Sequence, residues 1–122
     1  MRVLADTAVW VEHLRTGNAR LSALLDEGLV LVHPFVIGEL ACGNLRNRRE
    51  LLALLSELPS TAVATPDEAL HFIDHHRLMG RGIGYVDVHL LASVALSPDA
   101  RLWTLDRRLA TIAAELKLAI SR

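Results

Sequence analysis

Hydrophobic and polar positions divide the chain into two kinds of segment. Short apolar runs without polar alternation, such as the run that opens the chain and residues 29–32, are typical of strands buried on both faces of a sheet. Longer stretches carry apolar residues at every third or fourth position, which indicates amphipathic helices. Because the two kinds of segment alternate, the pattern predicts a parallel sheet covered by helices on both faces. We therefore expect a three-layer α/β/α domain.

The predicted sheet has roughly five parallel strands, which are separated by helical segments. We expect strands over residues 1–6, 29–32, 61–64, 101–104 and 118–120, of which 61–64 is weak and 118–120 lies at an edge. We expect helices over residues 7–15, 18–28, 34–41, 51–58, 66–79, 85–96 and 106–116. Residues 44–49 are polar and basic, and we interpret them as a loop or helix junction.

Local signals place several of the helix boundaries. Asn18 is a good N-cap, and Pro34 suits the first turn of a helix. Residues 65–68 form a capping box with proline at the first helical position. Three glycines within residues 80–84 predict a flexible loop that approaches Asp87.

The length and composition of the chain describe one globular unit. Its 122 residues fit a single domain spanning residues 1–122, and a hydrophobic share of 52% argues against disorder. No apolar run reaches the roughly 20 residues of a membrane helix, and the N-terminus has no signal-peptide pattern, so we expect a cytoplasmic protein with no membrane partner. The single cysteine, Cys42, lies in an apolar helical stretch, and we interpret it as a buried small hydrophobic residue.

The charge of the chain is almost balanced. A net charge of −1, from 13 basic and 14 acidic residues, is not the overall signature of a nucleic-acid-binding domain. All the basic residues except Lys117 are arginine, which suits bidentate contacts to phosphate. Any binding of nucleic acid must therefore rest on local patches of arginine and weaken as salt is raised.

Four acidic residues stand out because their neighbours are apolar or small: Asp6, Glu39, Asp87 and Asp106. Asp6 and Asp106 follow strands, at the carboxyl edge where parallel sheets place their ligands. Each aspartate could instead be only a helix N-cap, and Glu39 a partly exposed helix residue. Four such residues together favour a shared role, because carboxylates in apolar surroundings need their charge compensated. A hard divalent cation, Mg²⁺ or Mn²⁺, is a natural compensator.

The acidic residues lie in four motifs that carry a family resemblance. In order along the chain they are Asp6-Thr7, Gly38-Glu39-Leu40, residues 84–92 around Asp87 and residues 103–109 around Asp106. Any one motif is weak, but the four in this order and spacing are fairly specific. With these motifs the whole chain resembles a PIN-domain ribonuclease of the VapC kind, the toxin of bacterial VapBC toxin–antitoxin pairs. No member of the acidic quartet is replaced.

That resemblance implies that the four carboxylates surround one or two Mg²⁺ or Mn²⁺ ions. Asp6 and Asp87 would be the main direct ligands, whereas Glu39 and Asp106 would bind through water or complete a second ion. A metal held in this way orients and activates a water for attack on a phosphodiester. The four residues would thus be catalytic.

The resemblance also implies supporting residues and an activity. Thr104 matches a Ser/Thr position that supports the site, and Thr7 follows the first aspartate as in many members. The implied activity is a metal-dependent endoribonuclease that cuts a structured RNA, such as tRNA or rRNA, and thereby inhibits translation. From their positions alone, Arg107 and Arg108 after Asp106, and Arg46, Arg48 and Arg49 after Glu39, are candidate RNA-binding residues; surface solvation or pairing with carboxylates explains each of them equally well.

A homodimer and a cognate VapB-like antitoxin are the protein partners that the resemblance implies. The apolar helix over residues 51–58, together with Ala41 and Leu45, is a candidate contact surface. The chain has more apolar helical surface than a small monomer needs, which favours such a contact.

The histidines suggest a different metal site, which we consider less favoured. His71 and His75 have the i, i+4 spacing of a zinc-binding pair, and His76 is adjacent, but no further ligand supports the pair. A solvated helix face or a dimer surface explains them better. His89, two residues after Asp87, points elsewhere on its helix and is interpreted as structural.

Three alternative functions remain to be compared with the nuclease. A signalling receiver domain also gathers carboxylates at strand ends, but it requires an aspartate after the third strand and a lysine after the fifth, and this chain has neither. A PIN fold could also serve only as a non-catalytic protein-interaction module. A DNA nuclease or flap-type enzyme is the third alternative, since nothing in the sequence reads the 2′-hydroxyl of RNA.

Overall fold

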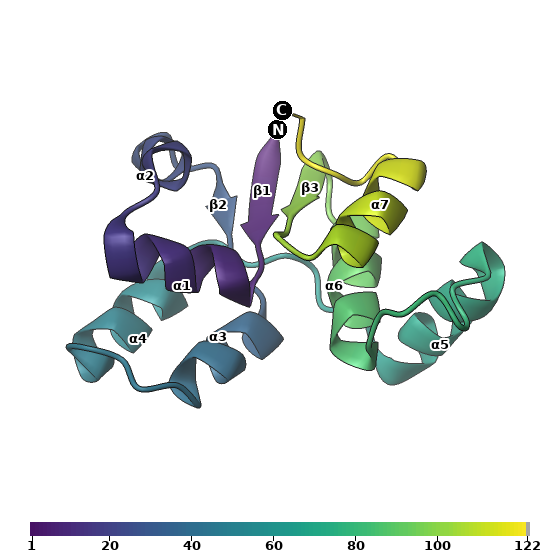
Figure 1. The fold of residues 1–122 in the computed structure, drawn as a ribbon, viewed down its shortest axis with the longest axis horizontal. Helices are drawn as coiled ribbons and strands as arrows, with labels where there is room; N and C mark the ends of the chain where they lie inside the picture. The colour runs from purple at the N-terminus through teal and green to yellow at the C-terminus, as the bar shows by residue number, and fades with distance from the viewer. Residues whose placement is uncertain (122) are drawn as a thin grey trace.

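Three parallel strands form the central sheet in the computed structural model, which describes residues 1–121 (Figure 1). In spatial order they are β2 (Val30–Leu31), β1 (Arg2–Ala5) and β3 (Ala100–Trp103). The register places Leu4 between Leu31 and Leu102, and all three side chains are buried. The apolar run that opens the chain is therefore the central strand, as its pattern predicts.

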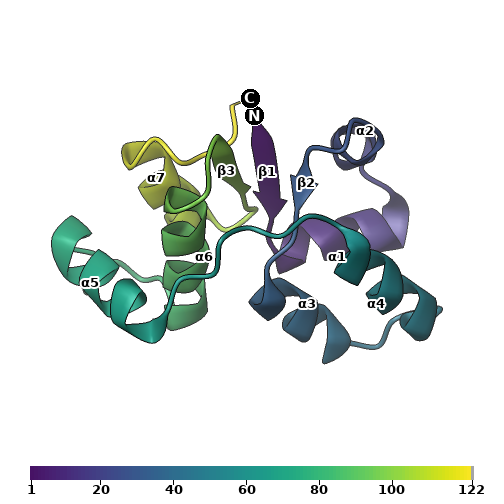
Figure 2. The ribbon, with the colours of Figure 1, turned by 180° about the vertical axis from the view of Figure 1, so that it is seen from behind.

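Helices cover both faces of this sheet, which confirms the predicted α/β architecture. They are α1 (Thr7–Thr16), α2 (Ala19–Asp26), α3 (Pro34–Ala41), α4 (Arg48–Glu57), α5 (Pro66–His76), α6 (Tyr85–Ala95) and α7 (Arg107–Glu115). Figure 1 is seen from the face that carries α1 and α7, and Figure 2 from the face that carries α6. No helix within residues 1–121 is long and apolar enough to cross a bilayer.

One hydrophobic core holds the helices against the sheet. Val9 of α1, Leu91 of α6 and Leu109 of α7 are all fully buried and join the core cluster around Leu4. Burial of each such side chain contributes about 1.5–3 kcal/mol relative to exposure. The first turns of α1 and α7 are thereby fixed beside the carboxyl edge of the sheet.

The local capping signals are confirmed at three helices. The side chain of Asn18 accepts a hydrogen bond from the backbone N–H of Leu21 at 2.9 Å, and Pro34 is the first residue of α3. Thr65 and Glu68 form the predicted capping box: each side chain accepts from the other's backbone N–H, at 3.1 and 2.9 Å. These bonds satisfy donors that a helix start otherwise leaves unpaired.

The predicted strand over residues 61–64 is wrong, and the reason lies in two serine side chains, one in α6 and one just after its end. Only one residue pair, Val32 with Ser60, forms a parallel bridge there. The backbone N–H groups of Ala62 and Ala64 donate instead to the hydroxyls of Ser97 and Ser93, at 2.9 and 3.0 Å. Two serine hydroxyls, from Ser93 in α6 and from Ser97 just after it, therefore replace the strand ladder as hydrogen-bond partners, and the segment stays irregular.

The predicted edge strand over residues 118–120 is also reduced to a single bridge, between Leu102 and Ala119. The N–H of Leu102 donates to the carbonyl of Leu118 at 2.6 Å, and the N–H of Ile120 donates to the carbonyl of Leu102 at 3.0 Å. All pairing of the segment thus involves one residue of β3. The sheet has three strands within residues 1–121 rather than about five.

Two further sequence interpretations are corrected. Cys42 is exposed, not buried, because it is the C-cap residue of α3 and lies beyond the apolar face of that helix. The helix predicted over residues 66–79 ends at His76, where Arg77 adopts a left-handed conformation with φ 55°. The N–H of Leu78 then bonds back to the carbonyl of Ile73 at 3.0 Å, which closes the helix.

Candidate functional site

The carboxyl ends of β1 and β3 bring Asp6 against Thr104. The backbone N–H of Asp6 donates to the carbonyl of Trp103 at 3.0 Å, which continues the β1–β3 pairing by one residue. The hydroxyl of Thr104 donates to Oδ2 of Asp6, while Oδ1 accepts from the N–H of Val9 at 3.4 Å and so caps α1. Asp6 is therefore both an N-cap and a carboxylate held at the sheet edge, which are the two roles that the sequence left open.

Thr104 also links Asp6 to Asp106. Its hydroxyl oxygen accepts a hydrogen bond from the backbone N–H of Asp106 at 3.1 Å. Oδ1 of Asp106 accepts from the N–H of Leu109 at 2.9 Å and caps α7. One hydroxyl thus connects the carboxylate of Asp6 to the backbone of Asp106.

Glu39 reaches the same region from α3. The hydroxyl of Thr7, the first residue of α1, donates to Oε1 of Glu39 at 2.6 Å. This bond joins two helices that also pack against each other. The two threonines that were predicted to support the site, Thr7 and Thr104, thus each contact one of its carboxylates.

Asp87 lies in the first turn of α6, on the face of the sheet opposite α1 and α7. Its Oδ2 accepts a hydrogen bond from the backbone N–H of Gly84 at 3.1 Å. Gly84 is the N-cap residue of α6 and ends the glycine-containing loop, so the loop fixes the carboxylate that it precedes. The sequence predicts that this loop approaches Asp87, but not that it donates a hydrogen bond to it.

Two of the carboxylates have raised pKa values. Burial raises the pKa of Asp6, and the charge of Asp87 adds to this, while hydrogen bonds from Thr104 and Val9 oppose it. Burial also raises the pKa of Asp87, and repulsion by Asp106 and Glu39 adds to the effect. Asp87 is therefore within electrostatic reach of the other three carboxylates.

The four carboxylates fit a hard divalent cation by their chemistry. All four offer oxygen ligands, and their mutual repulsion is relieved by positive charge placed among them. Within residues 1–121, however, no three histidine, cysteine, aspartate or glutamate side chains lie close enough together to hold one ion. The structure links the quartet through hydrogen bonds and charge, and does not bring three of them into a closed ligand set.

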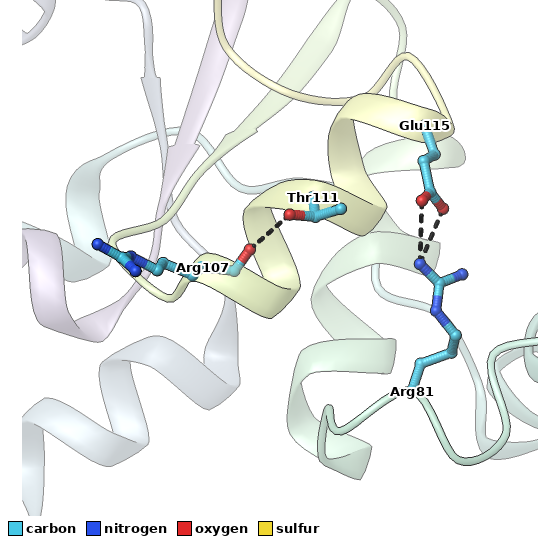
Figure 3. Close-up of polar contacts among 4 residues, drawn as sticks. All are labelled: Arg81, Arg107, Thr111 and Glu115. Carbon is cyan, nitrogen blue, oxygen red and sulfur yellow. Dashed lines mark hydrogen bonds and ion pairs between the residues drawn. The ribbon is translucent and has the colours of Figure 1, made fainter.

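The candidate arginines lie on two different sides of the quartet. Arg107 and Arg108 begin α7, directly after Asp106, and both are exposed. On the other side, Arg48 donates to the carbonyl of Ala41 at 2.8 Å, so its guanidinium is engaged in closing the end of α3. Sequence reasoning missed another arginine: Arg81 pairs with both carboxylate oxygens of Glu115 at 3.0 Å (Figure 3), across 34 residues, with no local signal.

A cavity of about 640 Å³ opens beside Glu39 and Thr7. Its walls come from α1, α3, α4 and the loop before α4, and combine apolar with charged side chains: Val11, Leu14, Arg15, Glu39, Leu45, Arg46 and Leu51. Arg15 was missed in the sequence. Its signal was present, because Arg15 lies eight residues after Thr7, on the same face of α1.

The histidine cluster of α5 does not resemble a metal centre. His71 and His75 are exposed and their rings stack, with centroids 5.8 Å apart. His76 packs on Phe72, with ring centroids at 4.3 Å. His89 is buried against Phe35 and Tyr85, in agreement with its interpretation as structural.

Comparison with known proteins identifies the family. Residues 3–115 match the model of the PIN domain. The chain is 48% identical over 119 residues to Ribonuclease VapC32 of Mycobacterium tuberculosis, from the strains CDC 1551 / Oshkosh and ATCC 25618 / H37Rv. The match covers 98% of this chain and 96% of each relative. The chain therefore belongs to the PIN-domain family, and within it to the VapC-type proteins.

Proposed function

We propose that this protein is a divalent-metal-dependent endoribonuclease, the toxin of a toxin–antitoxin pair. In this proposal it acts in the cytoplasm as a single PIN domain and hydrolyses phosphodiester bonds in a structured RNA, such as tRNA or rRNA, which inhibits translation. The observation that carries the proposal is the linked acidic quartet in a chain that is 48% identical to a ribonuclease along nearly its full length.

The four carboxylates are assigned the roles of metal ligands. Asp6 and Asp87 hold Mg²⁺ or Mn²⁺ directly, and Glu39 and Asp106 bind through water or complete a second ion. Support for this division comes from burial, because Asp6 and Asp87 are the two whose pKa values are raised. A bound ion supplies a water of lowered pKa and neutralises charge on the phosphate oxygens.

The remaining residues of the site hold these carboxylates in place. Thr104 orients Asp6 and fixes the start of α7 at Asp106. Thr7 orients Glu39, and the N–H of Gly84 orients Asp87. Each carboxylate thus keeps a defined direction before substrate binds, which reduces the reorganisation required in the reaction.

The proposal includes a VapB-like antitoxin and a homodimer as protein partners. The cavity next to Glu39 supports the antitoxin contact, because Leu45 and Leu51 give it apolar walls at the place where the sequence predicts a contact surface. A partner segment that fills it lies against Glu39 and Thr7 and blocks access to the site.

Metal-dependent cleavage by the purified chain tests the proposal. The protein, freed of any partner, is incubated with a labelled panel of tRNA, rRNA fragments and matched DNA, in Mg²⁺ or Mn²⁺ and in EDTA. We expect RNA cleavage with metal and none with EDTA. Asp6→Asn should lower the rate by at least about 100-fold, because it removes a proposed direct ligand of the metal. A 100-fold loss corresponds to about 2.7 kcal/mol of barrier, at 1.36 kcal/mol for each factor of ten.

Asp67→Asn is the matched control, because Asp67 is exposed and starts α5 away from the quartet. It should cleave like the wild type. Cleavage of DNA but not RNA would replace the proposal with the DNA or flap-type nuclease. Folded, metal-bound protein that cleaves nothing would replace it with the interaction module.

A further inference from the structure

A second, cationic hollow lies between α7 and the glycine-containing loop. It has a volume of about 200 Å³ and is lined by Arg81, Arg107, Arg108, Thr111 and Ile112. Three of these five residues carry a guanidinium group. Guanidinium groups bind phosphate through paired hydrogen bonds, so a hollow with this lining suits a phosphate.

The charge of the hollow is only partly balanced. Glu115 neutralises Arg81, whose Nη2 donates to both carboxylate oxygens at 3.0 Å (Figure 3). Within residues 1–121 the ion pairs are this one and the pair between the N-terminus and Asp99, so no carboxylate pairs with Arg107 or Arg108. Thr111 donates to the carbonyl of Arg107 at 2.9 Å and adds no charge. Arg108 therefore keeps its positive charge available to an anion in the hollow, and Arg107 keeps a second one beside it.

The hollow is held in shape from both ends. Gly82 has φ +83°, and a Cβ placed there would lie 2.7 Å from Cδ and Nη1 of Arg108. The loop backbone therefore lies directly against the Arg108 side chain. About two turns further along α7, the Arg81–Glu115 pair ties the same loop to the helix. A guanidinium confined in this way loses less freedom on binding an anion.

Both walls of the hollow continue into the acidic quartet. Arg107 directly follows Asp106, the N-cap of α7, and the loop ends at Gly84, which donates to Asp87. Figure 3 shows the side chain of Arg107 extending from the first turn of α7 away from the Arg81–Glu115 pair. An RNA strand whose reacting phosphate lies at the acidic quartet can place its neighbouring phosphates along the first turn of α7.

We infer that the RNA places two backbone phosphates next to the cleavage position here, one in the hollow at Arg108 and one on the quartet side of the hollow at Arg107. Arg81 adds no available charge in the wild type, because Glu115 neutralises it. The inference rests on the proposed function and decides between the two candidate arginine groups. Arg46 lines the cavity beside Glu39, and Arg48 donates to the carbonyl of Ala41, so that side is left to the protein partner.

The salt dependence of RNA binding tests this assignment. Phosphate contacts do not depend on sequence, so a labelled RNA hairpin with single-stranded flanks is a suitable probe. Binding is measured from 50 to 300 mM salt in an Asp6→Asn background, which keeps the RNA intact. Arg107→Gln and Arg108→Gln should each weaken binding about 5- to 10-fold and reduce the slope of log K against log salt by about 0.7–1.

Two further variants make the test sharper. Glu115→Gln should tighten binding several-fold and steepen the slope, because it frees Arg81 for the RNA; the exposed pair that it breaks contributes little to folding. Arg49→Gln removes the same charge from α4 and should leave the slope unchanged. Arg108→Lys, which keeps the charge, should restore most of the slope and shows that the loop still folds.

The outcomes separate this inference from the proposed function. If the wild type cleaves RNA but the Arg107 and Arg108 variants match Arg49→Gln, the hollow is not the phosphate site. A weakening of binding by Glu115→Gln would also overturn the assignment. If the wild type neither binds nor cleaves any RNA, the proposed function fails and the inference fails with it.

Discussion

At the scale of single residues, Thr104 has the largest share in the organisation of the site. Its hydroxyl donates to Asp6 and accepts from the backbone of Asp106, so one oxygen orders the ends of β1 and α7. Hydrogen bonds to charged groups are worth about 1.5–3 kcal/mol. The orientation of Asp6 should therefore depend on this threonine more than on any residue of similar size nearby.

Thr104→Val keeps the shape of the side chain and removes the hydroxyl. We expect RNA cleavage at saturating metal to fall about 10- to 100-fold, because Asp6 loses its orientation and its pKa rises further. Single-turnover rates measure the effect, and their pH dependence should shift to higher pH. Thr104→Ser should recover most of the rate. An unchanged rate in the valine variant would show that the hydroxyl has no role in the site.

The raised pKa values of Asp6 and Asp87 predict how protons and metal compete. A raised pKa means that the folded state binds the proton more tightly than the unfolded chain, so these two groups add stability as pH falls and lose it as pH rises through the folded pKa. In the absence of divalent ions, Asp6→Asn should remove part of this pH dependence, since asparagine still caps α1. Mn²⁺ binding measured by calorimetry should weaken as pH is lowered from 8 to 5. Affinity independent of pH would contradict the assignment of these carboxylates as ligands.

At the scale of elements, local chemistry predicts helix ends well and strand pairing less well. The caps at Asn18 and Thr65 depend on residues three positions apart, so the sequence displays them directly. The segment over residues 61–64 depends on Ser93 and Ser97, about 30 residues away, which compete with a strand partner for its N–H groups. No local pattern reveals that competition, and the strand prediction fails for this reason.

The candidate site also has features that the sequence predicts and features that it does not. Asp6 and Thr104 could be placed together because both follow strands of one parallel sheet, and such strands end at one edge. The four acidic positions were identified from their apolar or small neighbours and from the order of their motifs, and their catalytic roles stay predictions. The Arg81–Glu115 pair joins a loop to a helix across 34 residues, and the sequence offers no periodicity that would connect them.

The glycine-containing loop allows a comparison of two similar substitutions. Gly80 and Gly82 both have positive φ, at 71° and 83°, but a Cβ at Gly80 meets nothing within 4 Å, whereas one at Gly82 meets Arg108. Gly80→Ala should cost about 1 kcal/mol of unfolding free energy from backbone strain alone. Gly82→Ala should add the displacement of Arg108, and so lower RNA affinity as well as stability. Urea unfolding and RNA binding measure the two effects; equal RNA affinity in both variants would mean that the loop does not position Arg108.

At the scale of the whole molecule, His33 links α3 to α6. It is fully buried and caps α3, with Nδ1 accepting from the N–H of Phe35 at 3.0 Å. Nδ1 is therefore the unprotonated nitrogen, and Nε2–H donates to the hydroxyl of Ser93 on α6 at 3.0 Å. Ser93 in turn accepts from Ala64, so the neutral histidine connects α3, α6 and the irregular segment between them.

This buried histidine makes the fold sensitive to acid. Burial, with a contribution from His89, lowers the pKa of His33 from 6.5 to about 4. The unfolded chain takes up a proton near pH 6.5 while the folded chain resists it, so the stabilisation is fully present above pH 6.5 and is lost as pH falls towards 4. A difference of about 2.5 units corresponds to about 3 kcal/mol, a large share of the stability of a small domain.

Urea unfolding between pH 7.5 and 4 measures this loss. We expect the free energy of unfolding to fall by about 3 kcal/mol through His33, whereas the raised pKa values of Asp6 and Asp87 act in the opposite direction. His33→Asn keeps a side chain that can cap α3, but it lowers stability at neutral pH because the smaller side chain leaves a gap. It should also make the free energy of unfolding less dependent on pH. His75→Asn, at an exposed position, should retain it. An equally steep loss in His33→Asn would place the acid sensitivity elsewhere in the molecule.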